Sequence, residues 1–593
     1  MKKGETKMES KGKIDPVTVA VLDNRLASAA AEMANTMIRT SRSPVWNEAH
    51  DFCTVIFDKN LRVVAQKDYI PLLAWASPFP MQEIARFAQQ KGIKKGDVFI
   101  HNDPYTGNNH QPDVNVVKPV FYQGKLVFWS VAKGHLSDIG GSGKGALGFD
   151  PSSRSVWADG LILPAAKLYE RGKLNEALWN VILANVKYAW VVEGDLMCEV
   201  GSVNVGERRL IELLDMYGVE TVETAIDEIL AATEREVREK IRGIPDGVYY
   251  GEGRIDHDGV IRDKSIIIRA KVTKEGTDLT IDFSESDAQR PGPLNSTFAN
   301  TASNASLAVH IVLPGEMKRN SGSMAPIKVI APKGLVANCE SPSPVVGCTV
   351  STAEAIVESV LKALAQAVPE WVMAGSCKIL AFHSAGFNPR TKRPFVFGDF
   401  FDHAGSGATM GVDGGDEVGS TISSGRGNTP DIEIIELVCP IRMLEFQIVP
   451  DRAGAGKWRG GNGMVSRFEV LADGIHTVTQ ASGLMKESAS FGVAGGKPAP
   501  PNEAWEIKPG GQKVWRDCNL NFEPEKGSTL GKYLMGGGGW GNPFERPIEK
   551  VREDVINEFV SVQKAREDYG VVIDPVTLEV NYQKTAEMRA RRG

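Results

Sequence analysis

The sequence predicts an α+β fold, a large mixed chain of several lobes in which antiparallel-rich sheets are flanked by helices. Its 593 residues, of which 42% are hydrophobic and 24% charged, are enough to bury a sizeable core. Helical periodicity marks several long segments, whereas alternating β-rich runs joined by short turns mark most of the others. No repeat period is present, so neither a solenoid nor a propeller is indicated.

Local signals order the elements of the N-terminal part. Asp15 followed by Pro16 is a helix start signal. Gln123-Gly124, flanked by β-rich runs, is typical of a two-residue hairpin turn. Together the signals predict a long amphipathic helix over 16–38, two strands within 51–66, a helix over 77–92 and a hairpin around 123–124.

The remaining elements follow from changes of periodicity. The charged series that ends the first helical stretch is typical of a solvated helix face. Glycine becomes frequent in the last third of the chain, where the pattern is strand-like. In order, we expect helices over 172–242, strands over 247–283, a helix over 352–371, Gly-rich strands to 545 and helices from 547.

These changes divide the chain into five segments, which we interpret as parts of one continuous unit. The predicted segments are a disordered tail at 1–14, an N-terminal lobe at 15–245, a central sheet-and-helix lobe at 246–375, a Gly-rich β lobe at 376–546 and a C-terminal helical tail at 547–593. The N-terminal lobe carries the candidate metal site described below.

Composition argues against several classes of protein. A net charge of -6, a pI near 6.0 and the lack of a dense Lys/Arg cluster argue against nucleic-acid binding. The charged opening sequence has no apolar region, and no run of 18 apolar residues occurs, so neither a secretory signal nor a membrane span is expected. Seven cysteines without a CxxC pair predict a cytoplasmic protein whose thiols serve as small core side chains.

Two His-x-x-Asp units lie on either side of the predicted hairpin. His110 and Asp113 form the first unit, and His135 and Asp138 form the second. If the turn is Gln123-Gly124, the numbers of paired residues sum to about 247, so Asp113 lies opposite residue 134 and His135 opposite residue 112. Both units are therefore expected at the same open end of one hairpin.

Two imidazoles and two carboxylates at one place are a plausible site for divalent Zn, Mn or Fe. Asp51, which follows His50 at the mouth of an earlier strand, offers one further carboxylate. The alternative is that each pair is an ordinary surface or capping pair, since a single His-x-x-Asp unit is more often that. From the residues alone, both interpretations stay open.

The chain lacks the common nucleotide and hydrolase motifs. GGSGKGALG at 140–148 does not fit the phosphate-binding loop pattern, so ATP is not expected to bind there. The run GGGGWGNPFER at 536–546 favours a tight turn or a close backbone approach over a dinucleotide site. Neither a G-x-S-x-G elbow nor an HExxH sequence occurs, which argues against the common serine hydrolase and zincin mechanisms.

Several motifs, in order over residues 15 to 565, resemble the hydantoinase B family. They are DFCTVIFD, GDVFIHNDPYTGNNHQPDV, GHLSDIGG, RPGPLNST, VIAPKG, NTPDIEIIE, RAGAGKWRGGNGM, GVAGG and GGGGWGNPFER. The family includes subunits of ATP-dependent hydantoinases, 5-oxoprolinases, caprolactamase, and acetone and acetophenone carboxylases. The joint pattern is far more specific than any one motif.

The resemblance implies the metal-bearing subunit of a hetero-oligomeric enzyme. Its expected partner is a hydantoinase A-like ATPase subunit, which uses ATP to phosphorylate the oxygen of a small-molecule carbonyl substrate. His110, Asp113 and His135 match the family's metal positions and are the candidate catalytic residues. Asp51 and Asp138 are the carboxylates expected to complete or support the site.

The sequence favours ketone carboxylation of the acetone or acetophenone type, through a phosphorylated enol, over ring-opening hydrolysis of a hydantoin, 5-oxoproline or lactam. The Ser-x-x-Ser-Glu/Asp-Arg-Arg-like element expected in ring-opening members has no paired arginines in residues 479–496. Trp75, Phe79 and Trp129 are candidates to line a pocket for an apolar ketone, with a core position as the alternative. A non-catalytic scaffold and a metallohydrolase independent of ATP are further alternatives.

Overall fold

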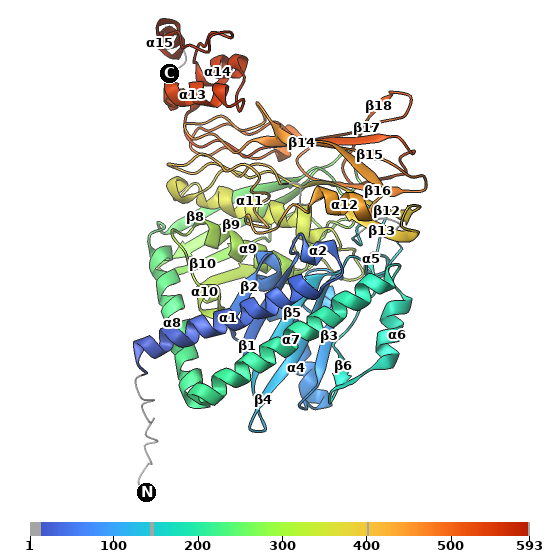
Figure 1. Cartoon of the computed structure of the whole chain (residues 1–593). Coiled ribbons are helices and arrows are strands. Elements are labelled where there is room, and N and C mark those ends of the chain that lie inside the picture. Colours follow the sequence, from blue (N-terminus) through green and yellow to red (C-terminus); the bar gives the residue numbers. More distant parts are fainter. Residues whose placement is uncertain (1–13, 143–146, 400–402, 591–593) are drawn as a thin grey trace.

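The computed structural model describes residues 14–142, 147–399 and 403–590. Four sheets and their helices are arranged along the molecule, and the predicted α+β class with antiparallel-rich sheets is confirmed. Figure 1 shows the N-terminal sheet toward one end, the C-terminal sheets toward the other, and α11 with its sheet between them. The helices α13 to α15 lie beyond the C-terminal sheets.

The N-terminal sheet has seven strands in the order β2-β1-β5-β4-β3-β6-β7. Two long helices, α1 (Pro16–Thr40) and α7 (Ala189–Tyr217), lie side by side across one of its faces (Figure 1). Its other face packs into the main hydrophobic core, which it shares with the central lobe. The strands are β1 (Phe52–Asp58), β2 (Val63–Asp68), β3 (Val98–His101), β4 (Asp113–Tyr122), β5 (Lys125–His135), β6 (Ala166–Glu170) and β7 (Lys173–Leu174).

The central sheet, in the order β11-β10-β9-β8, packs against α11 (Ala353–Leu364), which in turn contacts α9 (Phe298–Val312). Glycines on β8 permit this close packing, because a Cβ at Gly253 would lie 1.9 Å from the carbonyl oxygen of Ala355. The strands are β8 (Gly247–Ile255), β9 (Ile266–Glu275), β10 (Asp278–Asp282) and β11 (Ile327–Ile330).

Two further sheets form the C-terminal part, in the orders β13-β12-β16-β19 and β14-β15-β20-β17-β18. The glycine run after β20 approaches other backbone closely, since a Cβ at Gly537 would lie 1.8 Å from the Ser406 carbonyl oxygen. The predicted close backbone approach is therefore confirmed. The strands are β12 (Leu380–Asn388), β13 (Arg393–Gly398), β14 (Ile441–Val449), β15 (Gly463–Val470), β16 (His476–Ala481), β17 (Glu503–Ile507), β18 (Lys513–Arg516), β19 (Leu520–Phe522) and β20 (Thr529–Leu534).

One helix is shorter than predicted. The expected helix over 352–371 ends at Leu364, because Pro369 has no N–H to donate and restricts the residue before it. The remaining helices are α2 (Pro44–Asn47), α3 (Pro71–Ala76), α4 (Pro78–Lys91), α5 (Val156–Asp159), α6 (Glu176–Ala184), α8 (Val219–Arg242), α10 (Ser321–Met324), α12 (Ile432–Val438), α13 (Ile548–Ile556), α14 (Val562–Tyr569) and α15 (Tyr582–Ala590).

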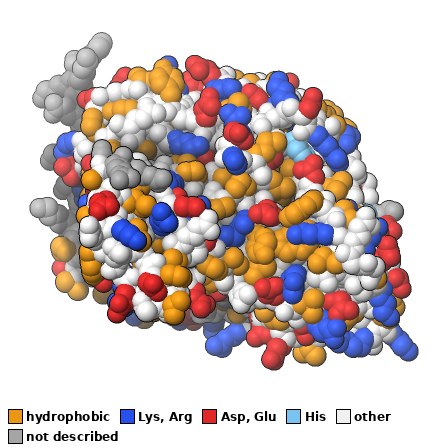
Figure 2. Space-filling view, turned by 90° about the horizontal axis from the view of Figure 1, so that it is seen from above, with side chains coloured by type: hydrophobic (Ala, Val, Ile, Leu, Met, Phe, Trp, Pro, Cys, Tyr) orange, Lys and Arg blue, Asp and Glu red, His pale blue; other side chains and the backbone are white. Residues whose placement is uncertain are grey.

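The predicted lobe boundaries at 245, 375 and 546 fall in connections between elements, and the division into lobes stays a prediction. Most of the predicted tail at 1–14 lies outside the described residues, as do residues 591–593. All seven cysteines are free and buried, as the sequence predicted. Within the described segments, every helix is too short or too polar to cross a membrane. On the face seen in Figure 2, basic and acidic side chains are interspersed.

Candidate metal centre

The β4–β5 hairpin brings the two His-x-x-Asp units to one end of the N-terminal sheet, but its register differs from the predicted one. Asp113 pairs directly with His135, because a bulge between Val120 and Phe121 shifts the register by one residue. Directly opposed residues of antiparallel strands project to the same face of the sheet. In the predicted register, Asp113 and His135 would point to opposite faces. The bulge is therefore what allows these two side chains to meet.

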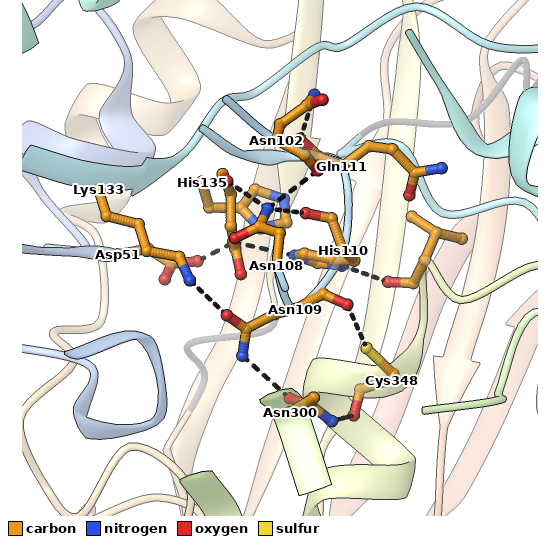
Figure 3. A network of polar contacts seen from close by, with 12 residues as sticks. Asp51, Asn102, Asn108, Asn109, His110, Gln111, Lys133, His135, Asn300 and Cys348 are labelled. Carbon is orange, nitrogen blue, oxygen red and sulfur yellow. Dashed lines mark hydrogen bonds and ion pairs between the residues drawn. The ribbon is translucent and has the colours of Figure 1, made fainter. Parts of the chain in front are cut away.

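Three side chains converge on the face of the sheet opposite α1 and α7. The Asp113 Oδ1 atom lies 2.9 Å from His110 Nε2 and 3.5 Å from His135 Nδ1. The two imidazole rings lie next to each other, with centroids 5.0 Å apart (Figure 3). Each of the three residues offers a ligand atom within 4.8 Å of the others. This distance is compatible with one shared ion.

Hydrogen bonding of His110 indicates that a cation fits this place. Its Nδ1 lies 2.6 Å from the Val346 carbonyl oxygen, which only accepts, so Nδ1 carries the hydrogen. In neutral His110 the lone pair of Nε2 then faces the Asp113 carboxylate, and only a second proton or a cation makes that contact favourable. Asp113 Oδ2 and His135 Nε2 are also buried, and no described residue forms a hydrogen bond with them.

Two other predicted residues occupy different positions. Asp51 lies beside the group, with Oδ2 3.9 Å from His135 Nδ1, and its backbone carbonyl accepts the His135 N–H. The structure does not bring Asp138 to the group. Its carboxylate accepts the backbone N–H groups of Gly140, Lys187 and Tyr188, and so caps the start of α7. The cap engages both of its oxygens, which explains why Asp138 faces away from the three converging side chains.

A buried polar network supports the loop that carries His110. The Lys133 ammonium donates to Asn109 Oδ1, and Asn109 Nδ2 donates to Asn300 Oδ1 on α9 at 3.2 Å (Figure 3). Asn108 Nδ2 donates to the carbonyls of His110 and Asp113, at 2.7 Å in each case. The network therefore ties the site-bearing loop to both the N-terminal sheet and the central lobe. Asp103 in the same loop caps a turn, as one of its two predicted interpretations required.

A second group of possible ligands, His257, Asp517 and Cys518, also lies within 4.8 Å. Here the Gly259 N–H donates to His257 Nδ1, so in the neutral ring Nε2 carries the hydrogen and donates to Asp517 Oδ2 at 3.1 Å. The contacts of this imidazole are thus satisfied without a metal. The His110 group is the better candidate for an ion.

Comparisons with known proteins fit this geometry. The sequence profile of the family described as Hydantoinase B/oxoprolinase matches residues 15–543, which is most of the chain. This chain belongs to that family. The beta chain of a caprolactamase from Pseudomonas jessenii is 34% identical over 575 residues, covering 95% of this chain and 97% of that protein. A protein named as the B-type component of a D-/L-hydantoinase, from Pseudomonas sp. (strain NS671), is 32% identical and covers 97% and 98%.

Solved structures agree with the family assignment. The crystal structure of an ATP-dependent caprolactamase from Pseudomonas jessenii has a TM-score of 0.89 and 32% identity, covering 98% of this chain and 100% of that one. A nucleotide-free acetone carboxylase structure has a TM-score of 0.88 over 98% of this chain and 83% of that one. Because its identity is only 19%, this second likeness shows a shared fold alone.

Electrostatics differ between the two aspartates of this hydantoinase B/oxoprolinase chain. Burial acts to raise the pKa of Asp113, but the charge and hydrogen bonds of His110, together with His135 and Lys133, hold it well below its ordinary value. Burial raises the pKa of Asp51 to about 7 against the opposing charge of His135, and the Asp113 charge adds to the rise. Asp113 is therefore an ionised ligand candidate at neutral pH, whereas Asp51 is partly protonated.

The converging side chains open into a cavity that encloses about 820 Å³ including its mouth. Sequence reasoning found its metal-side wall but missed the opposite one, where His383 of β12 and Gln480 of β16 lie in hydrogen-bond contact at 2.7 Å. Most of the lining is apolar. The apolar lining residues are Ile70, Leu72, Leu73, Leu147, Phe149, Val346, Val350, Ile379 and Ile422.

The predicted aromatic wall is wrong. Trp75, Phe79 and Trp129 do not line the cavity. Trp75 packs against His310 of α9 and Trp129 against Phe99 of β3, both in the core, which was the alternative interpretation for these residues. Proximity in sequence misled here because β5 alternates, and Trp129 lies too far from the open end of the hairpin to reach the cavity.

Proposed function

We propose that this chain is the metal-bearing, substrate-transforming subunit of an ATP-dependent two-component enzyme that opens a cyclic amide. The observation that carries the proposal is the convergence of His110, Asp113 and His135 at a largely apolar cavity. The sequence alone favours ketone carboxylation. The two relatives at 34% and 32% identity, which cover nearly the whole chain, carry names that refer to a lactam and a hydantoin. Their names move cyclic amides to first place.

The chemistry divides between the metal and the residues around it. His110 Nε2, His135 and Asp113 would hold a divalent ion, which would supply Lewis acidity and lower the pKa of a bound water to about 7. The Val346 carbonyl holds the imidazole of His110 in the required tautomer. The apolar wall would take the methylene groups of the ring and exclude bulk water. His383 and Gln480 face the substrate from the other side.

ATP belongs to the partner in this proposal. An amide carbonyl is a poor electrophile at neutral pH, and phosphorylation of its oxygen installs a leaving group. The sequence has no phosphate-binding loop motif, and the two relatives are named as subunits. We therefore assign the phosphorylation step to a hydantoinase A-like ATPase subunit, so that the active enzyme is a hetero-oligomer.

Ketone carboxylation is the second candidate. It is favoured by residues 479–496, which lack the paired arginines expected of ring-opening members. The apolar cavity also suits a ketone. Carboxylation would use the same ion and the same partner, but the phosphorylated species would be an enol, and bicarbonate would be consumed.

Co-purification with the ATPase encoded by the neighbouring gene tests the proposal. ATP consumption and product mass are measured with caprolactam, hydantoin and 5-oxoproline, and with acetone and acetophenone in the presence and absence of bicarbonate. The proposal requires ATP consumption coupled to ring opening, and both should be lost in His135→Ala. Bicarbonate-dependent turnover of a ketone alone would replace it with carboxylation. Ring opening without ATP would indicate a self-sufficient hydrolase, and full activity of His135→Ala a scaffold.

A further inference from the structure

A short helix braces the metal centre from the side opposite β5. This helix, α5, lies between the loop that carries His110 and the segment that carries Val346. Gln111 Nε2, next to His110 in the chain, donates to the Val156 carbonyl at 2.7 Å. The Val156 N–H in turn donates to the Pro342 carbonyl at 2.9 Å. The helix therefore contacts both segments whose relative position sets the His110–Val346 hydrogen bond.

Asp159, at the end of α5, makes the strongest of these contacts. It is 1% exposed, and its Oδ2 accepts the consecutive N–H groups of Val345 and Val346 at 2.7 and 3.1 Å. Its Oδ1 accepts the hydroxyl of Ser153. The groups that act on its pKa are these three donors and the Asp150 carboxylate, with no cation among the causes. A buried carboxyl group held only by neutral donors is costly, and such groups are often retained for a role beyond stability.

The contacts form a continuous path to the metal centre. Asp159 holds the N–H of Val346, and the carbonyl of the same residue accepts His110 Nδ1–H at 2.6 Å. That bond selects the tautomer in which Nε2 offers its lone pair toward Asp113. A shift of residues 345–346 would therefore turn the imidazole or release its tautomer.

We propose that Asp159 is a positioning residue of the metal centre, which acts on His110 through the backbone of Val345 and Val346. The inference rests on the proposed metal site and assigns one further residue to it. It requires only that the carboxyl group accept the two N–H groups. Both the ionised and the protonated acid do so, since a protonated Oδ1 would donate to Ser153 instead of accepting from it.

Metal affinity of purified variants tests this role. Asp159→Ala removes both acceptors and should weaken Zn²⁺ binding about 10-fold, the lower end of the range for residues that support metal ligands. Asp159→Asn should restore affinity to within about 3-fold, because its Oδ1 accepts both N–H groups while Nδ2 donates to Ser153. With Co²⁺ in place of Zn²⁺, the visible absorption band should shift in Asp159→Ala and not in Asp159→Asn.

Asp256→Ala is the matched control. Asp256 is also 1% exposed, and its carboxylate also accepts two consecutive backbone N–H groups, of Leu484 and Met485, and a serine hydroxyl. It has no contact with His110, so its removal should lower thermal stability comparably and leave Zn²⁺ affinity unchanged. If Asp159→Ala does not fold, Ser153→Ala replaces it, with an expected loss of about 3-fold.

The outcomes separate the inference from the metal site itself. Wild-type affinity in Asp159→Ala, or in Ser153→Ala where it serves as the replacement, overturns the positioning role and leaves the site intact. An equal loss of affinity in Asp256→Ala overturns it as well, because the effect would then be general destabilisation. Wild-type protein whose Zn²⁺ binding is unaffected by His110→Ala overturns both the site and the inference.

Discussion

Substitution of Gly134 by alanine should disturb the metal centre from the far face of the sheet. Gly134 precedes His135 on β5, and the indole of Trp46 lies directly over it. A Cβ at this position would lie 2.5 Å from Cζ2 and 2.9 Å from Nε1 of that ring. Trp46 is fully buried and its Nε1 donates to the His135 carbonyl at 2.8 Å, so the ring has nowhere to move without losing that bond.

The cost of Gly134→Ala follows from these two contacts. Overpacking of a filled core costs about 1–3 kcal/mol, and loss of the hydrogen bond adds about 0.5–1.5 kcal/mol. We therefore expect a destabilisation of about 2–4 kcal/mol, measured by urea unfolding, together with weaker Zn²⁺ binding, measured by titration. Gly510→Ala is the control, because a Cβ there meets nothing within 4 Å. Wild-type stability and affinity in Gly134→Ala would refute the reasoning.

Three further predictions concern buried carboxylates. Asp113→Asn should weaken Zn²⁺ binding by more than about 100-fold, the upper range for residues that merely support a ligand, with an unchanged far-UV circular dichroism spectrum; near-normal affinity would remove Asp113 from the site. Asp138→Ala should lower stability by about 0.5–2 kcal/mol through loss of the α7 cap and leave Zn²⁺ affinity unchanged, whereas loss of the metal would return Asp138 to the ligands. Burial raises the pKa of Asp195 to about 7 from 3.8, so the folded protein keeps a proton that the unfolded chain loses between those values. Stability from this group should thus fall as pH rises through that window, by up to about 1.4 kcal/mol per pH unit, and Asp195→Asn should show a flatter profile of melting temperature against pH; identical profiles would contradict this assignment.

Signals carried by side chains were sufficient to predict the elements and the candidate ligands. The hairpin was predictable because Gln123-Gly124 is local turn chemistry, and α1 because Asp15-Pro16 caps a clear helical period. His110, Asp113 and His135 stood out because imidazole and carboxylate groups recur at a short spacing.

What escaped prediction depends on backbone geometry and on contacts between distant segments. The bulge gave no signal, since Val120, Phe121 and Val127 all favour strands and fit either register equally well. Val346 acts through a backbone carbonyl, which has no side-chain signature, from 236 positions away. Asp138 matched the ligand pattern but caps a helix, and only the position of α7 reveals that.

The opposite wall of the cavity was equally out of reach of local reasoning. His383 and Gln480 come from two strands of a C-terminal sheet and meet the N-terminal sheet only in the folded chain. Their neighbours in the sequence carry β-strand alternation and nothing that distinguishes a cavity wall from a core. Such residues become visible only when the packing of the lobes is known.

Diffraction at the zinc absorption edge from crystals soaked in Zn²⁺ tests the central claim most directly. The account predicts an anomalous peak about 2.0–2.2 Å from His110 Nε2, from a ring nitrogen of His135 and from a carboxylate oxygen of Asp113. An ordered His110–Asp113–His135 group with no peak between its members, or an ion held only by His257, Asp517 and Cys518, would contradict it.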